Sequence, residues 1–383
     1  MNAHDDDARP LTKEDDLLEV FQGAFRPTAR FVGIEAEKFG IYEDGTPLHY
    51  RDAPGHPGVE TLFRALKRRY GWQPEAEKPG GPPLSLLRGR TSITLEPGAQ
   101  FELSGSPLDN VHDVAAEVET HRAELASLTE VPGLRWVGLG FHPFARPDDL
   151  DWVPKSRYPV MSAYFPTRGT RGLDMMRRTA TVQANFDFSS ERDAMRKLRV
   201  ALAAGPITTA LFASSQVVEG RRLPMKSRRA WVWLDTDNDR AGLLPFAWSP
   251  DARLGDYVRH ALDVPMFIVK REGRVLDATR HTFRHFMEHG IEGHRATTAD
   301  WESHLKTLFP DARLQRTLEV RGADSVPARL SMALPALWLA TLYDESVMQF
   351  VETRLVPYGH DAWAEARAKV PTEGLATRVG DTT

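Results

Sequence analysis

Four segments of this 383-residue chain alternate apolar and polar residues, and their polar positions are mostly acids and amides. Successive side chains of a β-strand point to opposite faces, so each segment has one apolar face and one polar face. Strands of this kind separated by helices predict an α+β fold, with an antiparallel or mixed sheet covered by helices on one face. The segments are 32–37, 93–103, 181–187 and 317–321, and they carry Glu35, Glu37, Glu96, Glu102, Gln183, Asn185, Glu319 and Arg321.

A sheet face this rich in acids repels itself unless cations lie on it. Glu35 and Glu37 project to one side of a strand within about 7 Å of each other, although that pair alone is equally consistent with a solvated edge. Glu96 and Glu102 flank a bend at Pro97 and can approach one point. Mg²⁺ takes oxygen ligands, keeps several waters and bridges to substrate phosphates. The acidic face therefore predicts a magnesium and phosphate site, with the amide oxygens of Gln183 or Asn185 as further ligands.

Arginines near these segments are candidates for contacting a phosphate. Transfer of a phosphoryl group needs cations that offset its charge. Arg321 is the first candidate because it shares a strand face with Glu319. For any one arginine, a structural ion pair is the commoner role. The others are Arg157, Arg178, Arg229 and Arg240, of which the last two flank Trp231 and Trp233.

Composition excludes several classes of function. The chain has no cysteine, so disulfides, thiolate zinc sites and cysteine nucleophiles are excluded. A net charge of −4 argues against general binding to nucleic acid or anionic membranes. No P-loop is present, and His281 and His285 lack the glutamate of a zinc protease motif, which favours a structural role for both. Without a signal peptide or a spanning segment, the sequence predicts a cytoplasmic protein.

The expected organisation is one catalytic domain over 12–375, between a disordered tail at 1–11 and a second tail at 376–383. Helical spacing predicts helices at 108–128, 254–262, 280–289, 300–308 and 333–355, and a helix with a proline interruption at 191–213. Residues 148–172 are expected to be irregular. Beyond Pro357 the chain is polar and is expected to be loosely held.

An ordered set of seven stretches resembles the plant-type glutamate–cysteine ligases of plants and proteobacteria. Each stretch alone is weak evidence for the family, whereas the whole set in this order is highly specific for it. They are GIEAEKFG at 33–40, SITLEPGAQFELSG at 92–105, GLDMM at 172–176, TVQANFDFSS at 181–190, DTDNDR at 235–240, ALDVPM at 261–266 and LEVRGAD at 318–324.

This resemblance implies a glutamine-synthetase-like carboxylate–amine ligase fold, in which an antiparallel sheet cradles Mg-ATP. It implies that ATP drives the joining of the L-glutamate γ-carboxylate to the L-cysteine amine through γ-glutamyl phosphate, the first step of glutathione biosynthesis. By position, it implies metal ligands at Glu35, Glu37, Glu96, Glu102 and Glu319, and a catalytic role for Arg321 together with Glu319. ATP would be bound by Arg229, Arg240, Gln183 and Asn185, and the amino acids by Arg157, Tyr158, Arg178, Trp231 and Trp233, although the arginines could exchange these two roles.

Two departures from the resembled family keep alternatives open. The chain has none of the cysteine pairs that the plant enzymes use for redox control. Relatives usually continue with further helices after the stretch matching 370–375, whereas this chain ends at Thr383. A γ-glutamyl ligase for another amine and a catalytically weakened regulatory homologue are therefore the alternatives. We expect a monomer or homodimer with no nucleic-acid or membrane partner.

Overall fold

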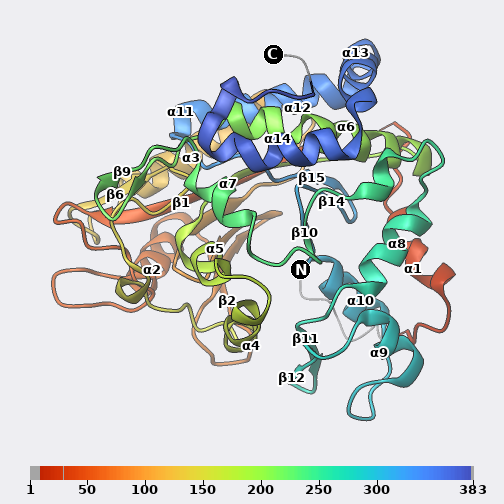
Figure 1. The fold of residues 1–383 in the computed structure, drawn as a ribbon. Coiled ribbons are helices and arrows are strands. Elements are labelled where there is room, and N and C mark those ends of the chain that lie inside the picture. The colour runs from red at the N-terminus through yellow and green to blue at the C-terminus, as the bar shows by residue number, and fades with distance from the viewer. Residues whose placement is uncertain (1–8, 29, 381–383) are drawn as a thin grey trace.

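The computed structural model describes residues 9–28 and 30–380 and is organised around one nine-stranded sheet (Figure 1). The strand order is β14-β15-β7-β1-β5-β4-β3-β2, and β6 pairs with the far end of β1. Every pairing in this sheet is antiparallel, which confirms the predicted sheet type. The strands are β1 (Val32–Tyr42), β2 (Gln73–Glu75), β3 (Ser85–Arg88), β4 (Thr91–Leu95), β5 (Phe101–Ser104), β6 (Leu134–Val137), β7 (Val182–Phe186), β14 (Ala312–Leu314) and β15 (Leu318–Val320).

Helices cover the apolar face of the sheet, as the alternation predicts. Val32, Ile34 and Ala36 of β1 are at most 9% exposed and belong to the main hydrophobic core. Helices α6, α12, α13 and α14 gather on that side in Figure 1. The helices are α1 (Glu14–Gln22), α2 (Val59–Tyr70), α3 (Val111–Ala126), α4 (Tyr158–Tyr164), α5 (Gly172–Arg178), α6 (Glu191–Leu211), α7 (Arg228–Trp233), α8 (Leu254–Asp263), α9 (Phe283–His289), α10 (Thr298–Leu305), α11 (Ala328–Ser331), α12 (Ala333–Tyr343), α13 (Glu345–Leu355) and α14 (Gly359–Glu373).

Three small two-stranded sheets lie outside the main sheet. They are β8 (Val217–Val218) with β9 (Arg221–Arg222), β10 (Ala241–Gly242) with β13 (Phe309–Pro310), and β11 (Ile268–Arg271) with β12 (Arg274–Asp277). Short 3-10 turns occupy Pro147–Asp149, Phe165–Thr167, Pro245–Trp248, Val356–Tyr358 and Gly374–Ala376. No helix of the described residues is long and apolar enough to cross a membrane.

Three sequence-based boundaries are wrong. Helix α6 is continuous through Pro206, because burial of its flanking turns outweighs the missing backbone donor. The helix expected at 333–355 is two helices, since the Asp344 side chain accepts from the backbone N–H of Ser346 and of Val347 and caps α13. The region 148–172, expected to be irregular, contains α4 and the start of α5.

The ends of the described chain are also more ordered than expected. Beyond Pro357 the chain forms α14, in which Trp363, Ala366 and Val370 are buried. This apolar stripe contains an alanine between two larger residues and is easily overlooked in a polar sequence. Near the other end, Leu11 is buried and its N–H donates to Ala296 O at 2.9 Å. Residues 1–8 and 381–383 of the predicted tails lie outside the described residues.

Candidate active site

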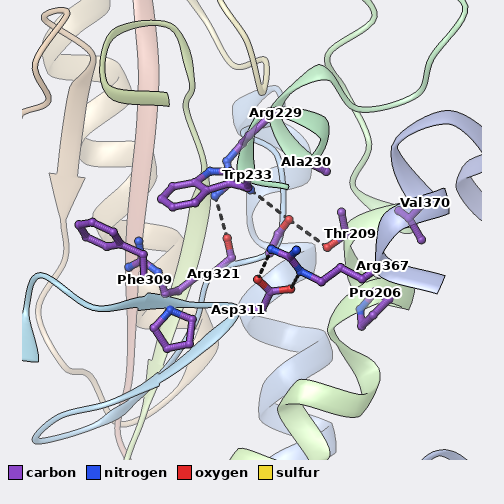
Figure 2. Close-up of a pocket in the computed structure, with 12 residues that line it drawn as sticks. Pro206, Thr209, Arg229, Ala230, Trp233, Phe309, Asp311, Arg321, Arg367 and Val370 are labelled. Atoms are coloured by element: carbon purple, nitrogen blue, oxygen red, sulfur yellow. Dashed lines mark hydrogen bonds and ion pairs between the residues drawn. The ribbon is translucent and has the colours of Figure 1, made fainter. Parts of the chain in front are cut away.

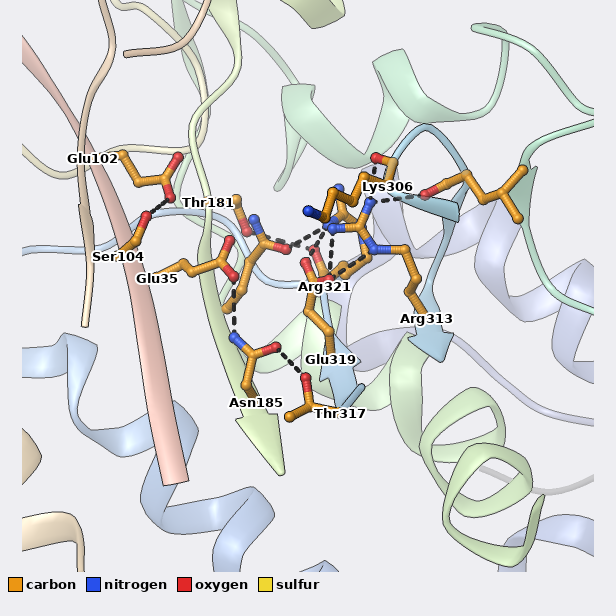
Figure 3. Close-up of polar contacts among 12 residues, drawn as sticks. Glu35, Glu102, Ser104, Thr181, Asn185, Lys306, Arg313, Thr317, Glu319 and Arg321 are labelled. Carbon is orange, nitrogen blue, oxygen red and sulfur yellow. Dashed lines mark hydrogen bonds and ion pairs between the residues drawn. The ribbon is translucent and has the colours of Figure 1, made fainter. Parts of the chain in front are cut away.

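The polar face of the sheet brings the acidic segments side by side, because the strand register aligns them. Glu37 on β1 is opposite Glu102 on β5, and Glu35 is opposite Gln183 on β7. One strand further along, Glu319 on β15 is opposite Asn185. Figure 3 shows Glu35 and Glu102 on one side of this row and the arginines near Glu319 on the other. Residues far apart in the sequence therefore share one surface.

This surface lines a cleft of about 760 Å³. The β11–β12 hairpin and the α10 region also line it, and they contribute Lys270, Arg271 and Lys306. A cleft of this size fits the typical range for a small-molecule site. Of the residues predicted from sequence, the cleft is lined by Glu35, Glu37, Glu96, Glu102, Arg157, Tyr158, Gln183, Arg229, Trp233 and Arg321.

The carboxylates of this cleft have unusual protonation properties. Glu35 and Glu37 lie deep in the molecule but stay partly exposed to the cleft. Desolvation, followed by repulsion from Glu319 and Glu102, raises the pKa of Glu35 to about 8. Desolvation and the nearby Glu96 and Glu102 raise the pKa of Glu37 well above its ordinary value. Each carboxylate has one neutral donor, the Asn185 amide at 3.0 Å for Glu35 and the Thr181 N–H at 2.9 Å for Glu37.

Glu319 differs from the other acids because two arginines hold it. Arg313 donates to Glu319 Oε2 from Nε at 2.7 Å, and Arg321 donates to Oε1. Desolvation alone would raise the pKa of Glu319, but these two guanidinium groups hold that pKa below its ordinary value. Arg321 also donates to Gln183 Oε1 at 2.7 Å. Glu319 therefore orients two cations at one end of the acidic row (Figure 3).

The donor set suits a magnesium–nucleotide complex better than a closed protein cage. Among residues 9–28 and 30–380, no three His, Asp or Glu side chains converge closely enough to hold one metal ion. Mg²⁺ needs only one or two carboxylates when waters and phosphate oxygens complete its shell. Carboxylates that repel one another across a cleft, as Glu35, Glu37 and Glu102 do, are stabilised by such a cation.

Two N–H donors at the cleft have no partner among the described residues, Arg229 Nε and Trp233 Nε1. Arg229 is 4% exposed, and its terminal nitrogens donate to the carbonyls of Arg321 and Gly322 at 2.9 and 3.1 Å. A buried unsatisfied donor is unfavourable, and a ligand oxygen would satisfy it. Both donors belong to α7, so one short helix presents them together.

Near the start of α4, Arg157 and Tyr158 also line the cleft. The Arg157 guanidinium lies 5.1 Å from the centre of the Tyr158 ring. The Tyr158 hydroxyl donates to Leu95 O at 3.3 Å. Both residues therefore lie beside the strand that leads to Glu96.

Three residues expected to bind substrates lie away from the cleft. Arg178 is buried, pairs with Asp174 and Glu219, and lies over the Phe141 ring. Arg240 is fully buried against Asp237 at 2.6 Å. Trp231 packs against the guanidinium groups of Arg171 and Arg228. The substrate-binding roles expected for Arg178, Arg240 and Trp231 are therefore not supported, because each side chain has a structural partner.

The sequence reasoning missed several basic residues of the site. Arg313 is on β14, a strand too short to show alternation, although it lies opposite Glu319. Lys155 donates to Leu95 O at 2.7 Å, and desolvation followed by the nearby Arg157 lowers its pKa to about 8. Arg271 at the end of β11 and Lys306, the residue after α10, also line the cleft. Of these missed residues, only Lys155 could have been found from the sequence, because it lies two positions before the predicted Arg157.

Known proteins are similar to this chain in sequence. The family described as glutamate–cysteine ligase family 2 matches residues 31–372. The chain is 42% identical over 377 residues to the chloroplastic glutamate–cysteine ligase of Brassica juncea, covering 97% of this chain and 72% of that protein. It is 43% identical over 379 residues to that of Nicotiana tabacum, covering 98% of this chain and 71% of the relative. The expected cytoplasmic location is contradicted, because both of these relatives are chloroplastic by name.

A solved structure is similar in fold. The glutamate–cysteine ligase of Francisella tularensis, solved in complex with AMP, aligns with a TM-score of 0.54 at 14% identity. The alignment covers 91% of this chain and 72% of that one. It supports the predicted carboxylate–amine ligase fold, with its large antiparallel sheet and packed helices. From the extent of the family match and the identity to the plant enzymes, this chain belongs to the glutamate–cysteine ligase family 2.

Proposed function

We propose that the acidic cleft joins the γ-carboxylate of glutamate to the amine of cysteine at the expense of ATP. The family membership makes the chain an ATP-dependent glutamate–cysteine ligase. The observation that carries the residue assignments is the row of acids from Glu102 to Glu319, which ends in the arginines Arg313 and Arg321. Acids suited to Mg²⁺ and cations suited to a phosphate therefore adjoin one cleft.

The chemistry proceeds in two transfers. An oxygen of the glutamate γ-carboxylate attacks the terminal phosphorus of ATP, and the bond from that phosphorus to the bridging oxygen breaks to release ADP. The amine nitrogen of cysteine then attacks the acyl carbon of γ-glutamyl phosphate. The carbon–oxygen bond to phosphate breaks, inorganic phosphate leaves, and the amine loses a proton. Phosphorylation is needed because a free carboxylate is a poor acyl donor.

Glu35, Glu37, Glu96 and Glu102 are the proposed Mg²⁺ ligands, with one or two carboxylates for each ion. Glu319, also expected from the sequence to be a ligand, is proposed instead to orient Arg313 and Arg321, which hold both of its carboxylate oxygens. When bound there, Mg²⁺ would offset the negative charge of the ATP phosphates. Arg321 is proposed to contact the transferring phosphoryl group, since Glu319 and Gln183 aim its guanidinium at the end of the acidic row. Gln183 and Asn185 support the site by holding Arg321 and Glu35.

Glutamate is proposed to bind near α7. Arg229 Nε and Trp233 Nε1 are unpartnered donors, which suits the oxygens of an amino-acid carboxylate. Arg157 and Tyr158 are the candidates for the second amino acid, because they line the cleft beside Glu96 and Pro97. The sequence left open which arginines bind ATP and which bind the amino acids. This proposal gives the phosphate to Arg321, glutamate to Arg229 and the second amino acid to Arg157.

The test is mass spectrometry of the products formed from ATP, Mg²⁺, glutamate and an equimolar mixture of cysteine, serine, 2-aminobutyrate and glycine. We expect γ-glutamylcysteine as the main product, with one ADP released per peptide bond. A pocket can distinguish such amines only by small packing and polar differences, so minor products are expected. A main product with another amine would contradict the acceptor assignment, and ADP release without any amide would contradict the ligase reaction.

A further inference from the structure

The C-terminal helix α14 contacts both segments that carry the cleft arginines Arg229 and Arg321. Arg367 of α14 forms a two-point ion pair with Asp311, from Nε to Oδ2 at 2.7 Å and from Nη2 to Oδ1 at 2.9 Å. These side chains are 17% and 14% exposed, so solvent weakens the pair little. Figure 2 shows Arg367 reaching Asp311 beside Arg321 and Thr209.

Asp311 passes this restraint to Arg321 through the backbone. The Arg321 N–H donates to Asp311 O at 3.1 Å. The Arg321 carbonyl in turn accepts from Arg229 Nη2 at 2.9 Å. An unbroken series of polar contacts therefore leads from α14 to the two arginines of the cleft.

A second contact joins the end of α14 to the start of α7. Pro371 O accepts from the backbone N–H of Lys226 at 2.7 Å and of Ser227 at 3.1 Å. Ser227 is the N-cap of α7, since its hydroxyl accepts from the Ala230 N–H at 2.9 Å. Arg229 lies in the first turn of that helix, so α14 restrains it from this side as well.

Packing alone does not hold these arginines. A cavity of about 30 Å³, large enough for one or two waters, lies between them and α14. Thr209, Trp233 and Val370 are among its lining residues (Figure 2). The ion pair and the hydrogen bonds around it bridge this space, and they act together with the packing of α14 against α7.

We propose that Arg367 is a positioning residue for the ligase reaction, acting through Asp311 on Arg321 and on the Arg229 that holds its carbonyl. This inference rests on the role given to Arg321 under the proposed function. Misplacing a reacting or stabilising group by about 1 Å can lower the rate about 100-fold. Helix α14, which its polar sequence predicts to be loosely held, thus becomes part of the active-site architecture.

The test compares R367M and R367K with R196M. Arg196 is a matched control, because it ties α6 to Glu345 and Glu352 of α13 without touching the arginine segments. We expect R367M to lower kcat about 10- to 100-fold, with KM for cysteine within about twofold of wild type. R367K should restore part of kcat, because lysine keeps the charge but not the two-point geometry. R196M should keep wild-type kcat while losing comparable thermal stability.

Two further measurements separate this inference from the proposed function. When R367M is combined with R321K, kcat should fall less than threefold below that of R321K alone. The two effects should not be additive, because both changes disrupt the same series of contacts from Arg367 through Asp311 to Arg321. Calorimetry with a non-hydrolysable ATP analogue and Mg²⁺ needs no turnover, and its affinity should fall at R367M but not at R196M. Equal effects of R367M and R196M on kcat and on analogue affinity would overturn the positioning role. A wild-type chain that binds the analogue but forms no amide would overturn the proposed function alone.

Discussion

Replacing Glu35 with glutamine should stabilise the metal-free protein while removing its activity. Among the described residues, the Asn185 amide at 3.0 Å is the one hydrogen-bond donor to the Glu35 side chain, and a glutamine oxygen can accept the same hydrogen bond. At pH 7 the raised pKa of Glu35 means that folding requires this side chain to take up a proton, and glutamine removes that cost without leaving a cavity. It also removes a proposed Mg²⁺ ligand, so Mg²⁺-dependent turnover should be lost although the fold is strengthened.

The magnitude follows from the pKa of Glu35, which burial and the neighbouring acids raise from 4.5 to about 8. A raised carboxyl pKa gives stability that is complete below pH 4.5 and is lost as the pH rises to about 8. At pH 7 the loss is about 3 kcal/mol, at about 1.4 kcal/mol per pKa unit. Because Glu37 and Glu102 share the repulsion, we expect a gain in unfolding free energy of about 2 kcal/mol for E35Q. In a chain of this size, that corresponds to a Tm increase of about 2 to 3 °C.

Thermal unfolding of metal-free wild type and E35Q at pH 5, 6, 7 and 8 measures this effect. The Tm difference should grow with pH, and added Mg²⁺ should raise the Tm of wild type more than that of E35Q. The matched control is D237N, because Asp237 is a buried acid with a cation partner, Arg240 at 2.6 Å. D237N should lower the unfolding free energy by about 3 to 5 kcal/mol, since it leaves a buried arginine unpaired.

Three outcomes would refute this reasoning. A lower Tm for metal-free E35Q at pH 7 would mean that the carboxylate is compensated by some other group. A Tm difference that does not change from pH 5 to pH 8 would remove the electrostatic cause. Wild-type turnover in E35Q would exclude Glu35 as a metal ligand.

Other expected outcomes can be measured on the same protein. R321K should lower kcat/KM about 100-fold, measured by ADP release, because lysine cannot contact Glu319, Gln183 and a phosphate together; a loss under threefold would contradict its role. W233F removes an unpartnered N–H and should raise KM for glutamate about fivefold, with Tm unchanged within about 1 °C; an unchanged KM would place glutamate elsewhere. Burial lowers the pKa of His304 to about 3. The difference in unfolding free energy between wild type and H304Q should therefore be largest above pH 6.5, and it should fall by about 1.4 kcal/mol for each pH unit below pH 6.5. A pH-independent difference in denaturant unfolding would show that His304 accepts a proton in the folded state.

The strand alternation alone was enough to predict an antiparallel or mixed sheet and to group Glu35, Glu37, Glu102 and Glu319 on its polar face. Side-chain alternation is a local property, because every residue of a strand faces opposite to its neighbours. The apolar face was equally predictable, and Val32 and Ile34 are almost fully buried in the core. The substrates ATP, glutamate and cysteine were predicted from the family resemblance, because the periodicity of side chains carries no information about them.

Only the tertiary structure decided which arginines reach the cleft. Arg178, Arg229 and Arg240 have similar surroundings in the sequence, yet Arg178 and Arg240 are neutralised by acids within their own structural regions. Arg229 reaches the cleft because its terminal nitrogens bind carbonyls of another segment. The position of α14 was likewise decided by tertiary structure. Its narrow apolar stripe is buried only because α6 packs against it. Sequence determines what a residue can bind, whereas its partner depends on segments that folding brings from far along the chain.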